Sequence, residues 1–302
     1  MLESMKLNEY TTDYQEDIET LWVTMHSLQR QCFTPGLLRE GLEICNQLDA
    51  SNTPPKYLVL LSGHPDIFNS GGDLVKFTEF IVKKDRQGLL DYGLACIDLI
   101  YWLMTGGKHH ITTIAGVAGD ALGGGFESAL ACNYLFAEKR SQFAFPEIIF
   151  RLFPGMGGFI LLEKYLGIRE AERAVAESTR YSAEELFTKG VVYNLFENGE
   201  CRKGIEQKIK SLYKKNESIG VLQMLKRRAL DVSYNDLKYN VEQWVDVALN
   251  ISDKDLRMMA ALSRKQTKKA PQITPIAVET RVKKLHVSAE ANQNVQMALG
   301  LE

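Results

Sequence analysis

This chain of 302 residues has few cysteines and little net charge, and both shortages exclude classes of protein. Its five cysteines are widely spaced and include no Cys-x-x-Cys pair, which argues against a disulfide framework and favours a reducing compartment. The formal net charge is -2, and basic residues are scattered except near the C-terminal end, so nucleic-acid binding is not expected. The motifs Gly-Lys-Ser/Thr and Gly-x-Ser-x-Gly do not occur, so we expect neither a P-loop nor a serine-hydrolase triad.

Long apolar segments are also scarce. We see no uninterrupted run of about 18 apolar residues, so we expect no membrane-spanning helix. Residues 1–20 are polar and acidic and lack the apolar core of a signal peptide. These shortages together predict a cytoplasmic protein.

Apolar residues make up 45% of the chain, which is enough for a sizeable core in one or two domains. Their spacing predicts strands within 7–27, at 57–62 and at 111–114, and helices at about 35–48, from 74, at 87–105 and across 154–178. Strand, glycine turn and helix occur twice in that order, which indicates an α/β fold with crossover connections.

The last third of the chain is charged and helical, with a long amphipathic segment at 221–262 and a last helix from about Ile276. We therefore divide the chain into a core domain, residues 1–200, and a C-terminal helical region, residues 201–302. We expect this second region to serve oligomerisation and to cover an acyl pocket.

The stretch from residue 111 to residue 158 is the most informative. A β-branched run at 111–114 leads into a glycine-dense turn at 123–125, and an apolar helix follows at once. The first amides of such a helix have no partner within it, so they can hold a negatively charged oxygen. Glu127 stands just inside this helix, and Glu147 follows what reads as a hairpin. Two acids beside an anion site suggest acid–base chemistry on a carbonyl compound.

A second glycine turn, at residues 70–73, precedes the helix that starts at Leu74. Backbone amides from two such turns can converge on one oxygen. Taken alone, however, the glycines could be purely structural, Glu127 could simply favour the helix dipole, and Glu147 could cap a turn. The residue pattern by itself leaves these alternatives open.

Four motifs, in this order and spacing, resemble the crotonase, or enoyl-CoA hydratase/isomerase, superfamily. They read Phe68-Asn-Ser-Gly-Gly-Asp-Leu74, Ala121-Leu-Gly-Gly-Gly-Phe-Glu127, Phe145-Pro-Glu147 and Pro154-Gly-Met-Gly-Gly158. The resemblance implies a ββα spiral core and an assembly of three or six copies. It also implies an oxyanion hole made by the amides of Gly72 and Gly124, with Glu127 and Glu147 as the catalytic pair. It implies no cofactor beyond the coenzyme A (CoA) or acyl carrier protein that carries the substrate.

A narrower resemblance covers nearly the whole chain. His26 and the motifs Cys32-Phe-Thr-Pro35, Gly123-Gly-Gly-Phe-Glu-Ser-Ala129, Trp244-Val-Asp-Val-Ala-Leu249 and Asp255-Leu-Arg-Met-Met259 resemble diffusible-signal-factor synthases. This implies dehydration of a 3-hydroxyacyl group on acyl carrier protein to a cis-2-enoyl thioester, and then thioester hydrolysis. Where ordinary hydratases commonly have Asn-Gly, this chain has Ala118-Gly119-Asp120.

The roles of the two glutamates are not fixed by the motifs. We expect Glu147 to remove the proton at the α-carbon and Glu127 to protonate the departing hydroxyl, although the two roles could be exchanged. Two other functions stay open. One is a conventional enoyl-CoA hydratase, and the other is a regulatory binding protein with a sensor kinase as its partner.

Several further residues have a functional and a plain interpretation. Trp244, Leu256, Met258 and Met259 could line an acyl pocket or simply pack in the core. Lys226-Arg-Arg228 could meet an acidic carrier protein, although a solvated charged face is the simpler interpretation. His109 and His110 are expected on opposite faces of a strand, so we do not expect a metal site there.

Overall fold

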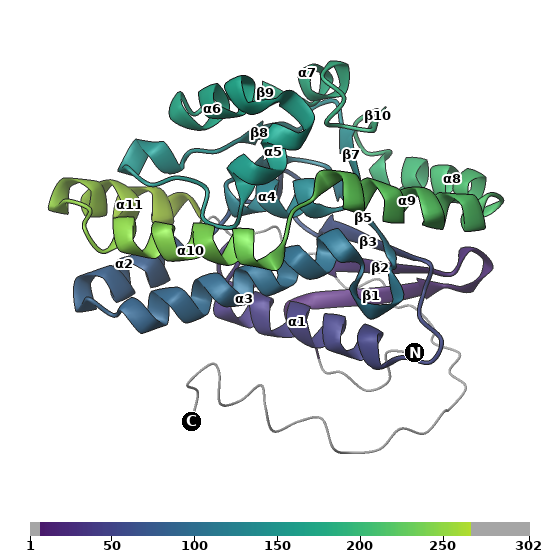
Figure 1. Ribbon diagram of the computed structural model, residues 1–302, viewed down its shortest axis with the longest axis horizontal. Coiled ribbons are helices and arrows are strands. Elements are labelled where there is room, and N and C mark those ends of the chain that lie inside the picture. The colour runs from purple at the N-terminus through teal and green to yellow at the C-terminus, as the bar shows by residue number, and fades with distance from the viewer. Residues whose placement is uncertain (1–6, 267–302) are drawn as a thin grey trace. The chain divides into compact units, whose positions relative to one another are not determined.

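The computed structural model describes residues 7–266, which all fall within one compact unit (Figure 1). A six-stranded sheet has the order β1-β2-β3-β5-β7-β10, with β1 antiparallel to β2 and all other pairs parallel. Its strands are β1 (Tyr10–Gln15), β2 (Thr20–Met25), β3 (Tyr57–Ser62), β5 (Thr112–Val117), β7 (Tyr134–Glu138) and β10 (Asn194–Phe196).

A smaller sheet has the order β4-β6-β8-β9, with β8 antiparallel to β9. Its strands are β4 (Ile67–Asn69), β6 (Asp120–Leu122), β8 (Gln142–Ala144) and β9 (Tyr181–Ser182).

The helices connect and cover the two sheets (Figure 1). The α-helices are α1 (Pro35–Ala50), α2 (Leu74–Lys83), α3 (Arg86–Thr105), α4 (Gly124–Ala131), α5 (Gly158–Leu166), α6 (Ile168–Ala176), α7 (Ala183–Thr188), α8 (Cys201–Tyr213), α9 (Asn216–Leu230), α10 (Tyr234–Ala248) and α11 (Asp253–Gln266). Within residues 7–266 the short 3-10 helices are η1 (Glu16–Ile18), η2 (Gly107–His109) and η3 (Glu147–Phe150).

The chain repeats one unit three times. A strand of the large sheet is followed by a strand of the small sheet and then by a helix, as in β3-β4-α2, β5-β6-α4 and β7-β8-η3-α5. This repetition is the ββα spiral that the sequence motifs predicted, and the α/β fold with a helical C-terminal part is confirmed. It also places the ends of β4 and β6 side by side, because these two strands are parallel neighbours.

The central strands of the large sheet are buried on both faces, which explains the continuous apolar run of β3. Alternate residues of β3 point to opposite sides. Leu58 and Leu60 belong to the main core, whereas Tyr57 and Val59 belong to a second core. Helix α8 covers that second core with Ile205 and Ile209.

Helix α3 corrects the expectation that no segment is long and apolar enough to span a membrane. The segment Arg86–His109 is long and apolar enough, by length and composition, to cross a membrane. It reaches this threshold because it is the core helix of the fold. Its residues Leu89, Ile97 and Ile100 are fully buried, and Figure 1 shows it running beside α10. Packing inside the protein therefore accounts for its apolar composition.

Side chains next to the first turn stabilise the starts of two helices. The Thr34 hydroxyl accepts a hydrogen bond from the Leu37 amide, with Pro35 in the first position of α1. Ser182 and Glu185 form the capping box at the start of α7.

Three other expectations were wrong. Strands β7 and β8 do not form a hairpin, because each pairs within a different sheet. His109 ends η2 and His110 follows it with φ +54, so neither histidine is on a strand. The segment 221–262 is not one continuous helix, because α9 ends at Leu230, Asp231 follows it with φ +47, and α10 ends before the Ser252 turn.

The predicted helix from Ile276 lies outside the described residues. The division of the chain at residue 200 stays a prediction, although α8 and α10 pack closely on the sheet and on α3, respectively.

Candidate active site

Two strand-to-helix turns meet at one edge of the small sheet. The first links β4 to α2 through Gly71 and Gly72, and the second links β6 to α4 through Gly123. Gly71 has φ +93 and Gly123 has φ +53, a region that side-chain-bearing residues rarely adopt. A Cβ built on Gly71 would lie 2.9 Å from the amide nitrogen of Gly124, so the turns touch and leave no room for larger residues.

The amides of Gly72 and Gly124 have no intramolecular acceptor among residues 7–266. The Gly71 carbonyl accepts a hydrogen bond from the Phe33 amide at 2.8 Å. Because the N–H and C=O of a trans peptide point in opposite directions, the Gly72 N–H is directed away from Phe33. The Gly124 amide is the first of α4 and points outward from the positive end of that helix. Both amides therefore remain free to bind an oxygen.

Glu127 lies in the first turn of α4 and is almost fully buried. Its Oε1 accepts hydrogen bonds from the amides of Met156 at 2.8 Å and Gly158 at 2.7 Å. Burial raises the pKa of Glu127 to about 7, and these two hydrogen bonds act in the opposite direction. The segment 154–158 thus fixes this carboxyl; we expected a helix from Pro154, but α5 begins only at Gly158.

Glu147 is the first residue of η3, and its carboxyl lies beside the second glycine turn. A Cβ built on Gly123 would lie 2.4 Å from Glu147 Oε1, which locates this carboxyl against the second glycine turn. Although the residue is half-buried, its Oε2 is shielded from solvent and has no hydrogen-bond partner among the described residues. Burial first, and then the charge of Glu127, raise the pKa of Glu147 well above its usual value.

The two carboxyls and the two glycine turns line one cavity of about 390 Å³. Its remaining wall is largely apolar. It includes Leu74, Phe77, Tyr92, Cys96, Val241 and Trp244. The geometry therefore brings together all four residues that the motifs singled out, namely Glu127, Glu147, Gly72 and Gly124. Their catalytic roles remain predictions.

The predicted acyl-pocket residues do not all reach this cavity. Trp244, on α10, does line it and packs against Phe77 with ring centroids 4.8 Å apart. Leu256, Met258 and Met259 are not among its lining residues.

The three residues miss the cavity because they lie nearer the start of α11 than the residues that line it. Met259 is fully buried in the core, Met258 is 41% exposed, and Leu256 packs against the core. The later residues of the same helix line the cavity instead. They are Leu262, Lys265 and Gln266.

The sequence interpretation also missed Arg180. Its guanidinium donates a hydrogen bond to Asp120 at 2.7 Å, and both residues line the cavity. Asp120 was noticed because it replaces the usual Asn-Gly pattern. Arg180 belongs to none of the motifs, so no local signal indicated it.

Two residues of the basic triplet, Lys226 and Arg227, do not lie on the solvated charged face that we expected, whereas Arg228 is exposed. Lys226 donates a hydrogen bond to the Asn133 carbonyl at 2.6 Å, and Arg227 donates one to Asn133 Oδ1 at 3.1 Å. Burial lowers the pKa of Lys226 to about 8. Lys226 and Arg227 therefore make their hydrogen bonds within the protein.

The described residues, 7–266, contain no group of three or more His, Cys, Asp or Glu side chains placed to hold a metal ion. His109 contacts the Asp49 carbonyl at 3.2 Å instead.

Comparison with solved structures supports the fold. An enoyl-CoA hydratase from Bacillus halodurans superposes with a TM-score of 0.71 at 19% identity, covering 84% of this chain and 100% of that one. Pseudomonas aeruginosa DspI superposes with a TM-score of 0.63 at 23% identity, covering 82% and 98%. At these identities the likeness concerns the fold alone.

Sequence relatives are more informative. The chain is 28% identical over 181 residues to the enoyl-CoA isomerase/hydratase fer4 of Mycosarcoma maydis, covering 58% of this chain and 64% of that protein. It is 31% identical over 139 residues to a probable enoyl-CoA hydratase of Rhizobium meliloti (strain 1021), covering 44% and 49%. It thus spans less than two thirds of the length of these curated relatives. The model of the enoyl-CoA hydratase/isomerase family matches residues 21–255, and the chain therefore belongs to this family.

Proposed function

We propose that this protein dehydrates a 3-hydroxyacyl thioester, carried by acyl carrier protein, to a cis-2-enoyl thioester and then hydrolyses that thioester. The released fatty acid would serve as a diffusible quorum-sensing signal. One observation carries the proposal: the carboxyls of Glu127 and Glu147 line one cavity together with two backbone amides that have no acceptor among residues 7–266. The narrower substrate and the second step rest on the resemblance to diffusible-signal-factor synthases.

The amides of Gly72 and Gly124 would bind the thioester carbonyl oxygen. Negative charge develops on that oxygen when the α-carbon loses its proton, so hydrogen bonds to it strengthen in the transition state. Losing one such donor typically raises the barrier by about 2.7–4 kcal/mol. The apolar cavity wall would exclude water and hold the alkyl chain.

The carboxyl environments favour the exchanged assignment of roles. Two amide hydrogen bonds stabilise the ionised form of Glu127, whereas one buried oxygen of Glu147 has no partner within residues 7–266, so Glu147 keeps its proton more strongly. Glu127 would therefore take the proton from the α-carbon, and Glu147 would give its proton to the departing 3-hydroxyl. One C–H bond and one C–O bond break, a C=C bond forms, and water leaves.

Hydrolysis would reuse the carbonyl site. A water molecule, deprotonated by a glutamate, would attack the thioester carbon, and the two amides would hold the resulting oxyanion. The C–S bond then breaks, the thiol of the carrier takes up the proton, and the carboxylic acid is released.

The partners that we propose follow from this chemistry. The substrate is a 3-hydroxyacyl group on acyl carrier protein or on CoA. We propose no further cofactor, and we propose that the protein acts in the cytoplasm. We also propose a homotrimer or hexamer. A sensor-kinase partner stays a prediction.

The proposal is tested with purified protein and with cells. Mass spectrometry should detect free cis-2-unsaturated fatty acids in cells expressing the wild-type chain, and none with the double variant Glu127→Ala, Glu147→Ala. In vitro, each single variant should lose dehydration of 3-hydroxyacyl carrier protein while keeping its far-UV circular dichroism spectrum. Retained turnover in either variant would remove that residue from the mechanism.

A conventional enoyl-CoA hydratase is the second candidate, and the named activity of the relatives favours it. It would use the same cavity in the opposite direction, adding water to an enoyl-CoA. Comparing kcat/KM for crotonyl-CoA hydration with kcat/KM for 3-hydroxyacyl-carrier-protein dehydration separates the two. Efficient crotonyl-CoA hydration without release of free acid would favour the hydratase.

A further inference from the structure

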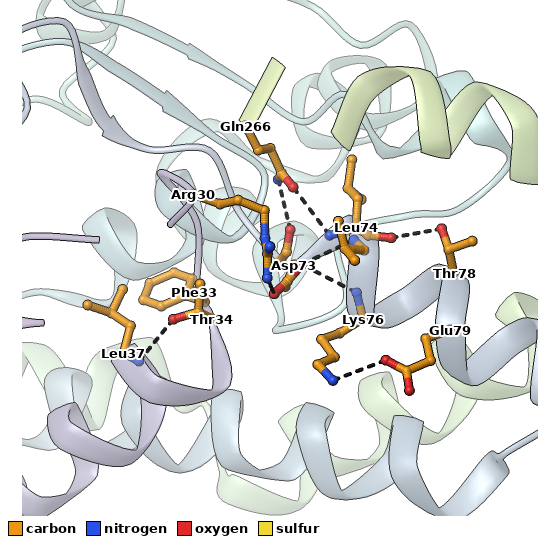
Figure 2. A network of polar contacts seen from close by, with 12 residues as sticks. Arg30, Phe33, Thr34, Leu37, Asp73, Leu74, Lys76, Thr78, Glu79 and Gln266 are labelled. Atoms are coloured by element: carbon orange, nitrogen blue, oxygen red, sulfur yellow. Dashed lines mark hydrogen bonds and ion pairs between the residues drawn. The ribbon is translucent and has the colours of Figure 1, made fainter. Parts of the chain in front are cut away.

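The last residue of α11 holds the glycine turn that carries one of the two unpaired amides. The Gln266 side chain is buried, and its Nε2 donates hydrogen bonds to the carbonyls of Gly72 at 2.9 Å and Ser70 at 3.4 Å. Its Oε1 accepts a hydrogen bond from the Leu74 amide at 3.3 Å. Figure 2 shows this side chain reaching from the end of α11 toward Leu74 and the neighbouring turn. One side-chain amide therefore spans the whole turn.

The main chain of the same residue closes a ring of contacts. The Gln266 carbonyl accepts a hydrogen bond from the Gln31 amide at 3.0 Å, and the Gln31 carbonyl accepts one from the Ser70 amide at 2.8 Å. The end of α11, the segment before α1 and the β4–α2 turn are thus tied together. These three segments are far apart in the sequence, so only the folded chain brings them into contact.

Both peptide groups that flank the Gly72 α-carbon are held from outside. The Phe33 amide binds the Gly71 carbonyl at 2.8 Å and so orients the peptide that contains the Gly72 N–H. On the following peptide, Gln266 binds the Gly72 carbonyl, and the Tyr92 hydroxyl accepts a hydrogen bond from the Asp73 amide at 3.0 Å. Because glycine has soft dihedral angles, these external contacts set the direction of its N–H.

Asp73 stabilises the residues that follow the β4–α2 turn. Its carboxylate caps α2 by accepting hydrogen bonds from the amides of Val75 and Lys76, and it pairs with Arg30 at 2.6 Å (Figure 2). Residues after the turn are thereby fixed to the helix. Gln266 is the contact that fixes the turn itself to the cavity wall, which α11 also forms with Leu262 and Lys265.

We propose that Gln266 is a positioning residue for the oxyanion hole. It directs the Gly72 N–H at the thioester oxygen without touching the reacting atoms. This inference rests on the proposed thioester chemistry. It predicts that loss of the Gln266 amide weakens binding of the transition state more than binding of the substrate.

The central variant is Gln266→Met, which keeps the length of the side chain and removes its hydrogen bonds. Gln223→Met is the matched control, because Gln223 is also a buried helical glutamine and donates to the Tyr134 hydroxyl at 2.7 Å, away from the cavity lining. We expect Gln266→Met to lower kcat about tenfold to a hundredfold, a part of the effect of losing one oxyanion donor, with KM changed less than about threefold. Gln223→Met should keep kcat even if its melting temperature falls by a similar amount.

A spectroscopic measurement reports the donor directly. Octanoyl-CoA with ¹³C at the carbonyl is bound to each protein, and isotope-edited infrared spectroscopy follows its C=O stretch. Hydrogen bonds to the oxygen should lower this frequency in the wild type and in Gln223→Met. The shift should be reduced in Gln266→Met. If that variant does not fold, Gln266→Asn replaces it, because its amide is one methylene too short for both contacts.

The outcomes distinguish the proposed function from the positioning role of Gln266. If the wild type neither turns over thioesters nor shifts the carbonyl stretch, the proposed function fails. If the wild type does both and the folded Gln266 variant matches it in kcat and in frequency, the positioning role is overturned and the proposed function stands. An equal loss of kcat in Gln223→Met would also overturn it, because the effect would then follow stability alone.

Discussion

At the scale of single residues, Glu127 and Glu147 share a cavity but differ in what their oxygens contact. Two backbone amides hold one oxygen of Glu127, and Glu147 has an oxygen with no partner among the described residues. Both carboxyls are buried at a cost to stability, because burial disfavours the ionised form. Such a cost is typical of groups that serve chemistry rather than folding.

Replacing Glu127 by Gln should therefore stabilise the protein above about pH 7. The folded-state pKa of Glu127 is raised from 4.5 to about 7, so the folded chain retains a proton that the unfolded chain has lost. Stability consequently falls as pH rises between these two values, and Gln avoids this loss while still accepting the two amide hydrogen bonds. We expect a gain on the order of 2–3 kcal/mol at pH 8 that shrinks toward zero below pH 4.5.

Urea denaturation of the wild type and Glu127→Gln across this pH range measures the gain. Glu184→Gln, on the exposed surface of α7, is the control and should show no such trend. A Glu127→Gln advantage that is constant with pH would contradict the assignment.

The sequence indicated these two glutamates but not Gln266, Tyr92 or Arg180. Glu127 and Glu147 stand within glycine and proline motifs whose local meaning is strong. Gln266 contacts residues almost two hundred positions earlier, and its own neighbourhood is an ordinary charged helix. Such a role depends on how distant segments pack, so no local pattern reveals it.

At the scale of elements, the two glycine turns are the segments that cannot accept substitutions. Their closeness follows from the parallel pairing of β4 with β6, which brings both carboxyl ends to one edge. Gly71 combines a positive φ with contact to the Gly124 amide, so it is constrained in two separate ways.

Gly71→Ala should thus lose thioester turnover as well as stability. The left-handed conformation costs a residue with a side chain about 1–2 kcal/mol, and the added Cβ at 2.9 Å would push the Gly124 amide aside. Gly190→Ala is the matched control, because Gly190 has φ +78 but open space around it. Turnover assays and thermal melts of both variants separate strain from displacement. Equal turnover in the two would show that the Gly71 contact is unimportant.

Elements were predictable where their signal was local. The cap of α1 and the capping box of α7 follow from a few adjacent residues, and the buried strand β3 follows from its apolar run. The supposed hairpin of β7 and β8 failed because pairing in a sheet is decided by distant strands. The acyl-pocket prediction failed for Leu256, Met258 and Met259 because only later residues of α11 reach the cavity, which depends on how that helix packs.

At the scale of the whole molecule, α9 buries a polar residue and exposes four apolar ones. Its polar residue Gln223 is buried against Tyr134, while apolar residues of the same helix are more than half exposed. They are Val221, Leu222, Met224 and Leu225. Exposed apolar residues gathered on one helix indicate a contact surface, and we propose that other copies of this chain cover it in the trimer or hexamer.

Changing Leu222 to Glu should break that assembly, because a buried carboxylate without a partner disfavours the interface. Light scattering after size-exclusion chromatography should show a trimer or hexamer for the wild type and smaller species for Leu222→Glu. Val82→Glu, at a similarly exposed position on α2, should leave the mass unchanged. A wild type that elutes as a monomer at micromolar concentration would refute the proposed assembly.

Helix α3 has a consequence for how this protein behaves when it loses its structure. Its 24-residue segment Arg86–His109 is shielded only while the neighbouring helices, chiefly α10 and α1, lie against it. When the chain unfolds on heating, this apolar segment would be exposed. Unfolded chains would then aggregate faster than they could refold. We therefore expect calorimetric scans to be irreversible, with an apparent Tm that rises with heating rate. Full recovery of the signal on a second scan would show that this segment stays protected.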